Sequence, residues 1–164
     1  MKQVNLHLAK QNFKFSSAHF LIFDAKSAEK LHGHNYRVEV DIEIPITHDF
    51  SGQGYFVDFN VFKKYIKAEL DIWDEHVLLP AKNKEVLVQE NGNSLEVRFR
   101  ERYYVFPKNE VILLPITNTS VEQLADLLSS KFAREFSRYG VEAVRVSVEE
   151  TQGQSAMVRA VCQS

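Results

Sequence analysis

Apolar and polar residues alternate clearly along the run HNYRVEVDIEI, which spans residues 34–44. One face of this run carries Tyr36, Val38, Val40, Ile42 and Ile44. A repeat of two is typical of a strand with one buried face, so the run predicts a long antiparallel strand that Pro45 ends. The segment 12–20 (NFKFSSAHF) alternates in part, with Phe13, Phe15 and Ser17 on one face. It predicts a second strand whose far end carries His19.

Two segments repeat their apolar residues every three or four positions, which is the spacing of an amphipathic helix. The first covers residues 59–79 (FNVFKKYIKAELDIWDEHVLL), and Asp58 is its expected N-cap. Its apolar positions are Phe59, Phe62, Ile66, Leu70 and Trp73. The second follows Asn118, with Thr119 or Ser120 as the expected cap, and Gly140 closes it. Its apolar positions are Leu124, Leu127, Leu128, Phe132 and Phe136.

Short alternating runs occupy the rest of the chain. Between the two helices, residues 84–114 contain Asn91-Gly92 flanked by alternating segments, which is a β-hairpin signature, and we expect an inserted β element over 82–115. After the second helix, VEAVRVSVEET and SAMVRAVC predict two further strands, separated by a break at Gly153. The order ββ, helix, inserted hairpin, helix, ββ predicts one α+β domain over residues 1–164.

Composition and charge exclude several classes of protein. The chain has 164 residues, of which 45% are hydrophobic and 26% charged, as in a folded domain with a packed core. A formal net charge of -2 provides no general positive field, so we expect neither nucleic acid nor a membrane surface as a partner. No stretch approaches the roughly 20 apolar residues of a membrane span, and no signal peptide opens the chain, so the expected location is the cytoplasm. Cys162 is the only cysteine, which rules out an internal disulfide.

Three histidines suggest a metal site. His32 and His34 are two positions apart at the start of a predicted strand, so both project from one face, and Gly33 between them adds no bulk to the other. If the strand that ends at His19 is a neighbour, it supplies a third imidazole. Three histidine ligands leave the fourth position of a tetrahedral zinc ion open, as in catalytic sites. The alternative is a His-Gly-His turn with surface histidines, and His19 as an ordinary core histidine.

Five motifs in order resemble the 6-pyruvoyl-tetrahydropterin synthase and 6-carboxy-tetrahydropterin synthase family. They are FSSAHF (15–20), LHGHNYRVEV (31–40), GYFVDF (54–59), NTSVEQLA (118–125) and VEET (148–151). The resemblance implies a tunnelling fold (ββααββ), a four-stranded antiparallel sheet with two helices on one face. It also implies that three subunits close a 12-stranded barrel and that two trimers stack as a homohexamer.

The resemblance further implies a set of site residues. Zinc is expected on His19, His32 and His34. Glu150 is expected to anchor a pterin ring, because one carboxylate can accept two parallel N–H bonds from a 2-amino-4-oxo ring. Thr151 beside it and Ser120 are the other expected substrate-binding residues. Without the resemblance, Glu150 reads as a solvated strand end.

The sequence departs from the family pattern at one expected catalytic position. Members that make pyruvoyl or carboxy pterins carry a cysteine four residues before the first histidine of HGH, and Ala28 stands there in this chain. The next residue, Glu29, forms EKLHGH, which resembles the ExxHGH pattern of a subgroup that uses glutamate instead. That subgroup converts dihydroneopterin triphosphate to 6-hydroxymethyl-dihydropterin. The alternative is a solvated loop glutamate between Lys26 and Lys30.

A second departure concerns an Asp-His dyad that moves protons in relatives. Asp74 matches the aspartate, but Glu75 follows it and His76 comes one position later. On a helix, a shift of one residue turns a side chain by about 100 degrees. Either Glu75 takes the role of the histidine or the end of the helix is remodelled so that His76 does.

Three functions follow as hypotheses. The first is a zinc-dependent lyase on 7,8-dihydroneopterin triphosphate, with the Glu29 motif favouring 6-hydroxymethyl-dihydropterin or a related product. A 6-carboxy-tetrahydropterin synthase of the queuosine pathway is an alternative to it. The second is a non-catalytic pterin-binding relative. The third is a structural oligomer whose histidines only bridge strands, which would hold no stoichiometric metal.

Overall fold

The computed structural model describes residues 2–163, which contain two α-helices and ten strands. The helices are α1 (Phe59–Trp73) and α2 (Val121–Phe136). The strands are β1 (Asn5–Leu8), β2 (Lys14–His19), β3 (His32–Glu43), β4 (His76–Pro80), β5 (Leu87–Asn91), β6 (Ser94–Phe99), β7 (Arg102–Pro107), β8 (Val111–Leu114), β9 (Ala143–Thr151) and β10 (Gln154–Val161). Neither helix in this part of the chain is long and apolar enough to cross a membrane.

The main sheet contains the expected antiparallel strands and extends beyond them. Its order is β10-β9-β3-β2-β4-β8, and the first four strands are antiparallel neighbours. β4 and β8 add two parallel strands beside β2, and β1 pairs with the far part of β3. The α+β fold with helices packed on a sheet is confirmed, but the sheet is larger than four strands.

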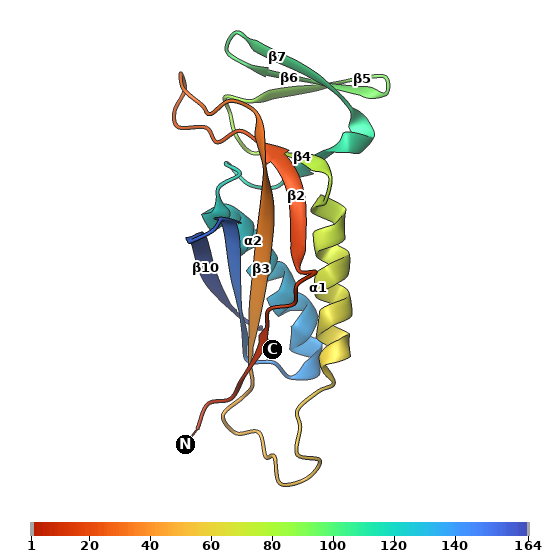
Figure 1. Ribbon diagram of the computed structural model, residues 1–164, viewed down its shortest axis with the longest axis vertical. Helices are drawn as coiled ribbons and strands as arrows, with labels where there is room; N and C mark the ends of the chain where they lie inside the picture. Colours follow the sequence, from red (N-terminus) through yellow and green to blue (C-terminus); the bar gives the residue numbers. More distant parts are fainter. Residues whose placement is uncertain (1, 164) are drawn as a thin grey trace.

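One core joins the sheet to both helices. The apolar face of β3 that the alternation predicts is buried, and it packs in the same cluster as the apolar stripes of α1 and α2. Asp58 and Ser120 are the N-caps of the two helices, and their side chains accept hydrogen bonds from Asn60 N and Gln123 N. Both helices therefore cover one face of the sheet, and the opposite face is left open (Figure 1).

The predicted first helix is too long. In the structure, α1 ends at Trp73. His76–Pro80, which the prediction placed in the last part of the helix, form β4. Glu75 adopts a left-handed conformation with φ of 58°, and its N–H donates to Ser16 O at 2.7 Å, which carries the chain out of the helix and into the sheet. A short apolar run such as HVLLP suits a buried strand and a helix equally in sequence, and pairing with β2 and β8 decides for the strand.

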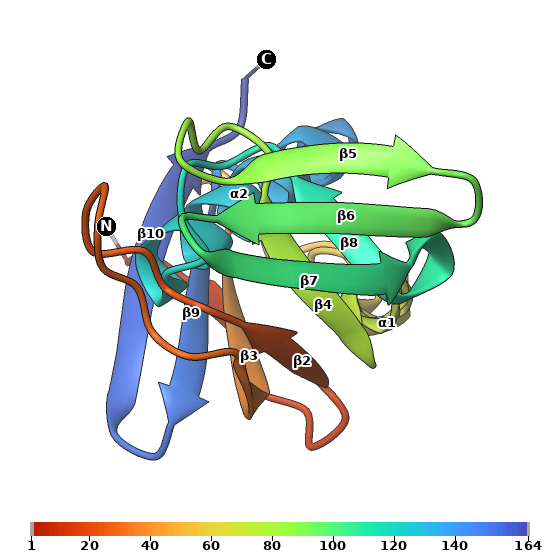
Figure 2. The ribbon, with the colours of Figure 1, turned by 90° about the horizontal axis from the view of Figure 1, so that it is seen from above.

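The inserted β element is also larger than a hairpin. Gly92, with φ of 58°, forms the expected turn between β5 and β6, and a second turn with Arg100 at φ of 55° adds β7 (Figure 2). This three-stranded sheet has its own core, which includes Val97 and Phe99 and also takes in Phe20 and Ile22 from the loop that follows β2. The insertion therefore lies at the same end of the molecule as the loop between β2 and β3 (Figure 1).

An ion pair network on the open face ties β9 and β10 to the end of β3. Glu43 is buried, accepts hydrogen bonds from Arg159 at 2.6–3.0 Å and pairs with Arg145 at 3.2 Å. The hydrogen bonds from Arg159 hold the pKa of Glu43 below its ordinary value. This network fixes the register of the strands whose other ends carry the candidate site.

The Glu43 network should make stability depend on pH in a defined direction. A glutamate with a depressed folded-state pKa stabilises the fold above its unfolded pKa, about 4.3, and this is lost as the pH falls through the folded-state pKa. We expect Glu43→Gln to lower the free energy of unfolding of the metal-free protein by about 1–3 kcal/mol at pH 7, and by much less at pH 3. Urea denaturation across this pH range measures the difference. Equal losses at both pH values would contradict the role given to Glu43.

Candidate metal centre

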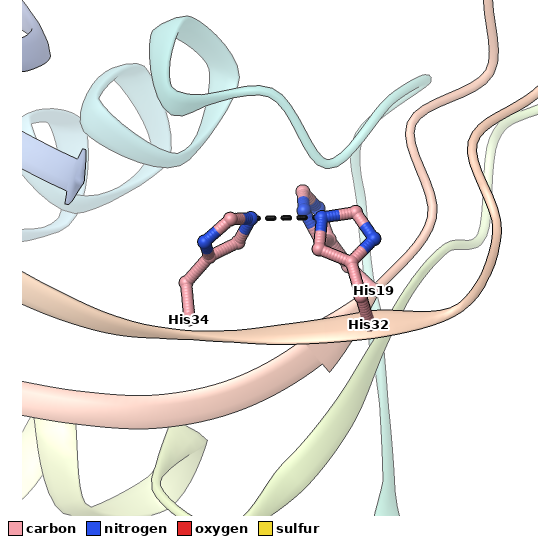
Figure 3. Close-up of side chains that lie close together, drawn as sticks. All are labelled: His19, His32 and His34. Carbon is pink, nitrogen blue, oxygen red and sulfur yellow. Dashed lines mark hydrogen bonds between the residues drawn. The ribbon is translucent and has the colours of Figure 1, made fainter.

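The pairing of β2 with β3 brings the three histidines together. His19 lies opposite His32 in the register, and Ser17 lies opposite His34. Because side chains alternate along a strand, His19, His32 and His34 all project from the same face. Figure 3 shows the three rings gathered above this strand pair, beneath the segment that leads into α2. The histidines are therefore not separate surface residues of a turn.

The distances suit one metal ion. Their candidate ligand atoms all lie within 4.8 Å of one another, and His32 Nε2 is 2.8 Å from His34 Nε2. Nitrogens bound at about 2.0–2.1 Å to a tetrahedral zinc ion lie about 3.4 Å apart. Small rotations of the rings are enough to reach that geometry.

The tautomer of His19 is fixed for ligation. Its Nδ1 lies 3.0 Å from the carbonyl oxygen of Thr119, so Nδ1 carries the proton and donates it. Nε2 then holds the lone pair, and this buried atom has no hydrogen-bond partner in residues 2–163. Burial also lowers the pKa of His19, which favours the neutral imidazole that a metal requires. An unpartnered buried lone pair fits a metal ligand, since without a ligand it is a cost to the fold.

His32 is oriented in the same way. Its Nδ1 lies 2.6 Å from the carbonyl oxygen of Lys30, so its Nε2 also presents a lone pair, here toward His34. Two imidazole lone pairs directed into one small space repel each other unless a cation or a proton lies between them. The three side chains thus fit a divalent metal ion, with Nε2 of His19 and His32 as fixed ligands.

Two carboxylates lie next to different histidines of the cluster. Glu29 Oε2 lies 3.8 Å from His32 Nε2, and Glu150 Oε1 lies 3.4 Å from His34 Nε2. Glu150 Oε2 is also 3.9 Å from His19 Nε2. Both glutamates keep part of their side chains exposed, 33% for Glu29 and 26% for Glu150, so a small molecule in the site can contact them.

Hydrogen bonds to Leu21 hold Glu29 in place. Its Oε1 accepts a hydrogen bond from Leu21 N at 3.1 Å, and its own N–H donates to Leu21 O at 2.8 Å. These bonds use one carboxylate oxygen and leave the other facing His32. Ala28 packs against the core of the inserted sheet, the one that includes Val97 and Phe99.

The proposed proton-moving group at the end of α1 lies apart from the cluster. Asp74 Oδ1 accepts from Ser16 N at 2.7 Å, and His76 Nδ1 donates to the backbone oxygen of Asp74 at 2.6 Å, so the two side chains form no dyad. Glu75 and His76 line a cavity of about 380 Å³ whose wall also includes His34. Over residues 2–163, no hydrogen bond or ion pair joins either side chain to the three histidines. Their catalytic role stays a prediction.

Two of the predicted substrate-binding residues also lie outside the cluster. Thr151 follows Glu150 in β9 and points to the open face, where its hydroxyl bonds Gln154 Oε1 at 2.7 Å. Ser120 Oγ accepts from Gln123 N at 3.3 Å as the cap of α2. Among the expected substrate-binding residues, Glu150 is the one that lies next to the histidine cluster.

The sequence analysis did not identify two residues that lie at the site. Tyr36 is fully buried beside His34, with ring centroids 5.6 Å apart, and its hydroxyl has no hydrogen-bond partner in the described chain. Its position two residues after His34 on the same face could have indicated this. Thr119 was expected only as a helix cap, and nothing in its sequence context indicates that its carbonyl orients His19.

Fold and site together define a class: a small α+β protein with three imidazoles placed to hold one metal ion and two carboxylates next to them. The sequence model of 6-pyruvoyl tetrahydropterin synthase matches residues 8–161. The chain therefore belongs to the 6-pyruvoyl tetrahydropterin synthase family of pterin biosynthesis.

Relatives in two groups resemble the chain over nearly its full length. A Methanocaldococcus jannaschii protein, provisionally named 6-carboxy-5,6,7,8-tetrahydropterin synthase, is 31% identical over 149 residues, or 89% of each chain. The crystal structure of 6-pyruvoyl tetrahydropterin synthase from Plasmodium vivax is 26% identical, with a TM-score of 0.88 over 98% of this chain and 99% of that one. A variant of the P. vivax protein in which a catalytic glutamate is replaced by alanine matches with 25% identity and the same TM-score, 0.88.

Removal of one imidazole should abolish tight metal binding. We expect His34→Ala to weaken binding of zinc by more than about 100-fold, because a three-ligand site becomes a two-ligand site. His7→Ala is the control, since His7 is exposed on β1 and pairs with Asp41 instead. Competition with a chromophoric chelator measures both affinities. Equal zinc affinity in the two variants would contradict the three-histidine centre.

Proposed function

We propose that the protein is a zinc-dependent lyase that acts on 7,8-dihydroneopterin triphosphate, with 6-hydroxymethyl-dihydropterin as the favoured product. The observation that carries the proposal is the placement of two carboxylates next to the three-histidine cluster, Glu29 beside His32 and Glu150 beside His34. One carboxylate can act on the side chain of the substrate while the other holds its ring. A bound zinc ion supplies a Lewis acid for the hydroxyl oxygens of that side chain.

Glu150 is proposed to hold the pterin ring. Its two oxygens face the cluster at 3.4 and 3.9 Å from His34 and His19, and about a quarter of the side chain is open. A carboxylate with both oxygens presented to one small space can accept two parallel N–H bonds from the 2-amino-4-oxo edge of a pterin. This contact would orient the side chain of the substrate toward His32 and Glu29.

Glu29 is proposed to be the general base. One of its oxygens is bound to Leu21 N and the other lies 3.8 Å from His32 Nε2, so the free oxygen can take a proton from a substrate held next to the cluster. The methyl group of Ala28 offers no thiol to do so. A catalytic glutamate in the P. vivax relative supports the use of a carboxylate for this step.

A second candidate function is that of a 6-carboxy-tetrahydropterin synthase. It is favoured by the names of the relatives from M. jannaschii and Pyrococcus horikoshii, which are 31% and 28% identical to this chain. The mass of the pterin product separates the two candidates. Tight pterin binding without any product would instead favour a non-catalytic relative.

The protein is also proposed to act as a homohexamer, a dimer of trimers. The open face of the sheet is polar and carries a hollow of about 620 Å³, lined by residues such as Arg37, Glu149 and Thr151. In residues 2–163, the side chains of Glu75 and His76 form no hydrogen bond or ion pair with the three histidines of their own chain, so their proposed catalytic role is assigned to the site of a neighbouring copy. Light scattering on the purified protein gives its mass in solution.

The glutamate assignment predicts a large catalytic defect in one variant. With zinc-loaded protein and 7,8-dihydroneopterin triphosphate, we expect Glu29→Gln to lower kcat by about 10²–10⁴-fold, because the amide cannot accept the proton. Zinc content should not change, since Glu29 is not a predicted ligand. Glu101→Gln, at an exposed position in the turn between β6 and β7, is the control. Product formation followed by liquid chromatography and mass spectrometry gives the rates. A kcat for Glu29→Gln within threefold of wild type would remove Glu29 from the mechanism.

A further inference from the structure

Two arginines of the inserted sheet hold the loop that carries Glu29. Arg102, the first residue of β7, donates from Nη2 to the carbonyl oxygen of Ala28 at 2.9 Å and from Nη1 to the carbonyl oxygen of Glu29. Arg100 donates from Nε to the carbonyl oxygen of Ala25 and pairs with Glu85 at 2.6 Å. A single guanidinium thus bonds the carbonyl groups of the two peptide units that flank the Cα of Glu29.

The internal bonds of the loop leave these carbonyls for an outside donor. Residues 21–29 fold back on themselves, with Glu29 N–H donating to Leu21 O at 2.8 Å and Phe23 N–H donating to Ser27 O at 2.9 Å. Asn118 fixes the inner arm by bonding both backbone groups of Ile22, at 3.1 and 2.8 Å. Arg102 contacts the other arm of the loop, the one that ends at Glu29.

The setting of Arg102 suits a rigid contact. The side chain is half-buried, and its guanidinium lies 5.8 Å from the ring of Phe99, which is itself buried in the core shared with Phe20 and Ile22. In residues 2–163, the ion pairs of the chain do not include Arg102, so its donors are directed at the backbone. A planar guanidinium that bonds two carbonyls fixes direction as well as distance, which a lysine cannot do.

We propose that Arg102 is a positioning residue for Glu29, and that the inserted sheet serves as the platform from which it acts. The inference rests on the proposed role of Glu29 as the base. Glu29 has one oxygen bound to Leu21 N and one near His32, so a shift of its backbone moves the free oxygen away from the substrate. A catalytic group displaced by about 1 Å can lose about 10² in rate. Glu150 lies on β9, outside this loop, so ring binding is separate from the contact.

The steady-state test separates positioning from general stability. We expect Arg102→Met to lower kcat by about 10–100-fold with KM changed by less than about threefold, and Arg102→Lys to recover only part of the loss. Arg98→Met is the matched control, because Arg98 lies exposed on β6 of the same sheet and stacks on Tyr103, at 4.0 Å from the ring centroid. Zinc content and the thermal midpoint are measured for all three variants. An Arg102→Lys variant with the kcat of wild type would overturn the proposal, even if Arg102→Met does not fold.

A double-mutant cycle tests whether Arg102 acts through Glu29. If it does, Arg102→Met should reduce the residual kcat of Glu29→Gln by less than about twofold, since no base remains to be positioned. Independent losses that multiply would contradict the proposal, because they would mean that Arg102 supports the site in some other way.

Hydrogen exchange gives a readout that does not need turnover. The amides of Leu21 and Glu29 bond within the loop, and we expect them to exchange at least about 10-fold faster in Arg102→Met than in Arg98→Met. Unchanged exchange would overturn the positioning role. If wild-type protein with zinc gives no product, the proposed function fails, and exchange alone then decides whether Arg102 holds the loop.

Discussion

The register between β2 and β3 is the constraint on which the rest of the structure depends. It sets His19 opposite His32 and places His34 two positions further along, so that three imidazoles share one face. A slip of one residue would turn His32 and His34 to the open face and leave His19 alone. The buried alternation of β3 prevents such a slip, because it would also expose Val38, Val40 and Ile42.

The rest of the fold supplies what the two strands cannot. The start of α2 provides the carbonyl of Thr119 that fixes the tautomer of His19, and β9 provides Glu150. The loop after β2 provides Glu29, and the inserted sheet holds that loop from outside. Three segments far apart in sequence therefore meet next to the three imidazoles, and the inserted sheet holds one of these segments in place.

Much of this could be predicted from local pattern. The alternation in β3 and in part of β2 identified the buried faces, and the spacing of His32 and His34 identified the shared face. The family motifs connected these strands to Glu29 and Glu150. What failed was decided by tertiary contacts: α1 ends at Trp73 because Glu75 turns the chain to bond Ser16, and HVLLP becomes a strand because β2 and β8 flank it. No sequence pattern indicates that Arg102 reaches the carbonyls of Ala28 and Glu29, since every residue type has a backbone carbonyl that can accept such a bond.

The central claim is that His19, His32 and His34 bind one zinc ion and leave a coordination position for substrate. X-ray absorption at the zinc edge of stoichiometrically loaded protein tests it most directly. The account predicts three imidazole nitrogens at about 2.0–2.1 Å and one further light-atom ligand that changes when a pterin is added. Fewer than three imidazoles around the ion, or a fourth protein ligand that closes the shell and is unaffected by pterin, would contradict the account.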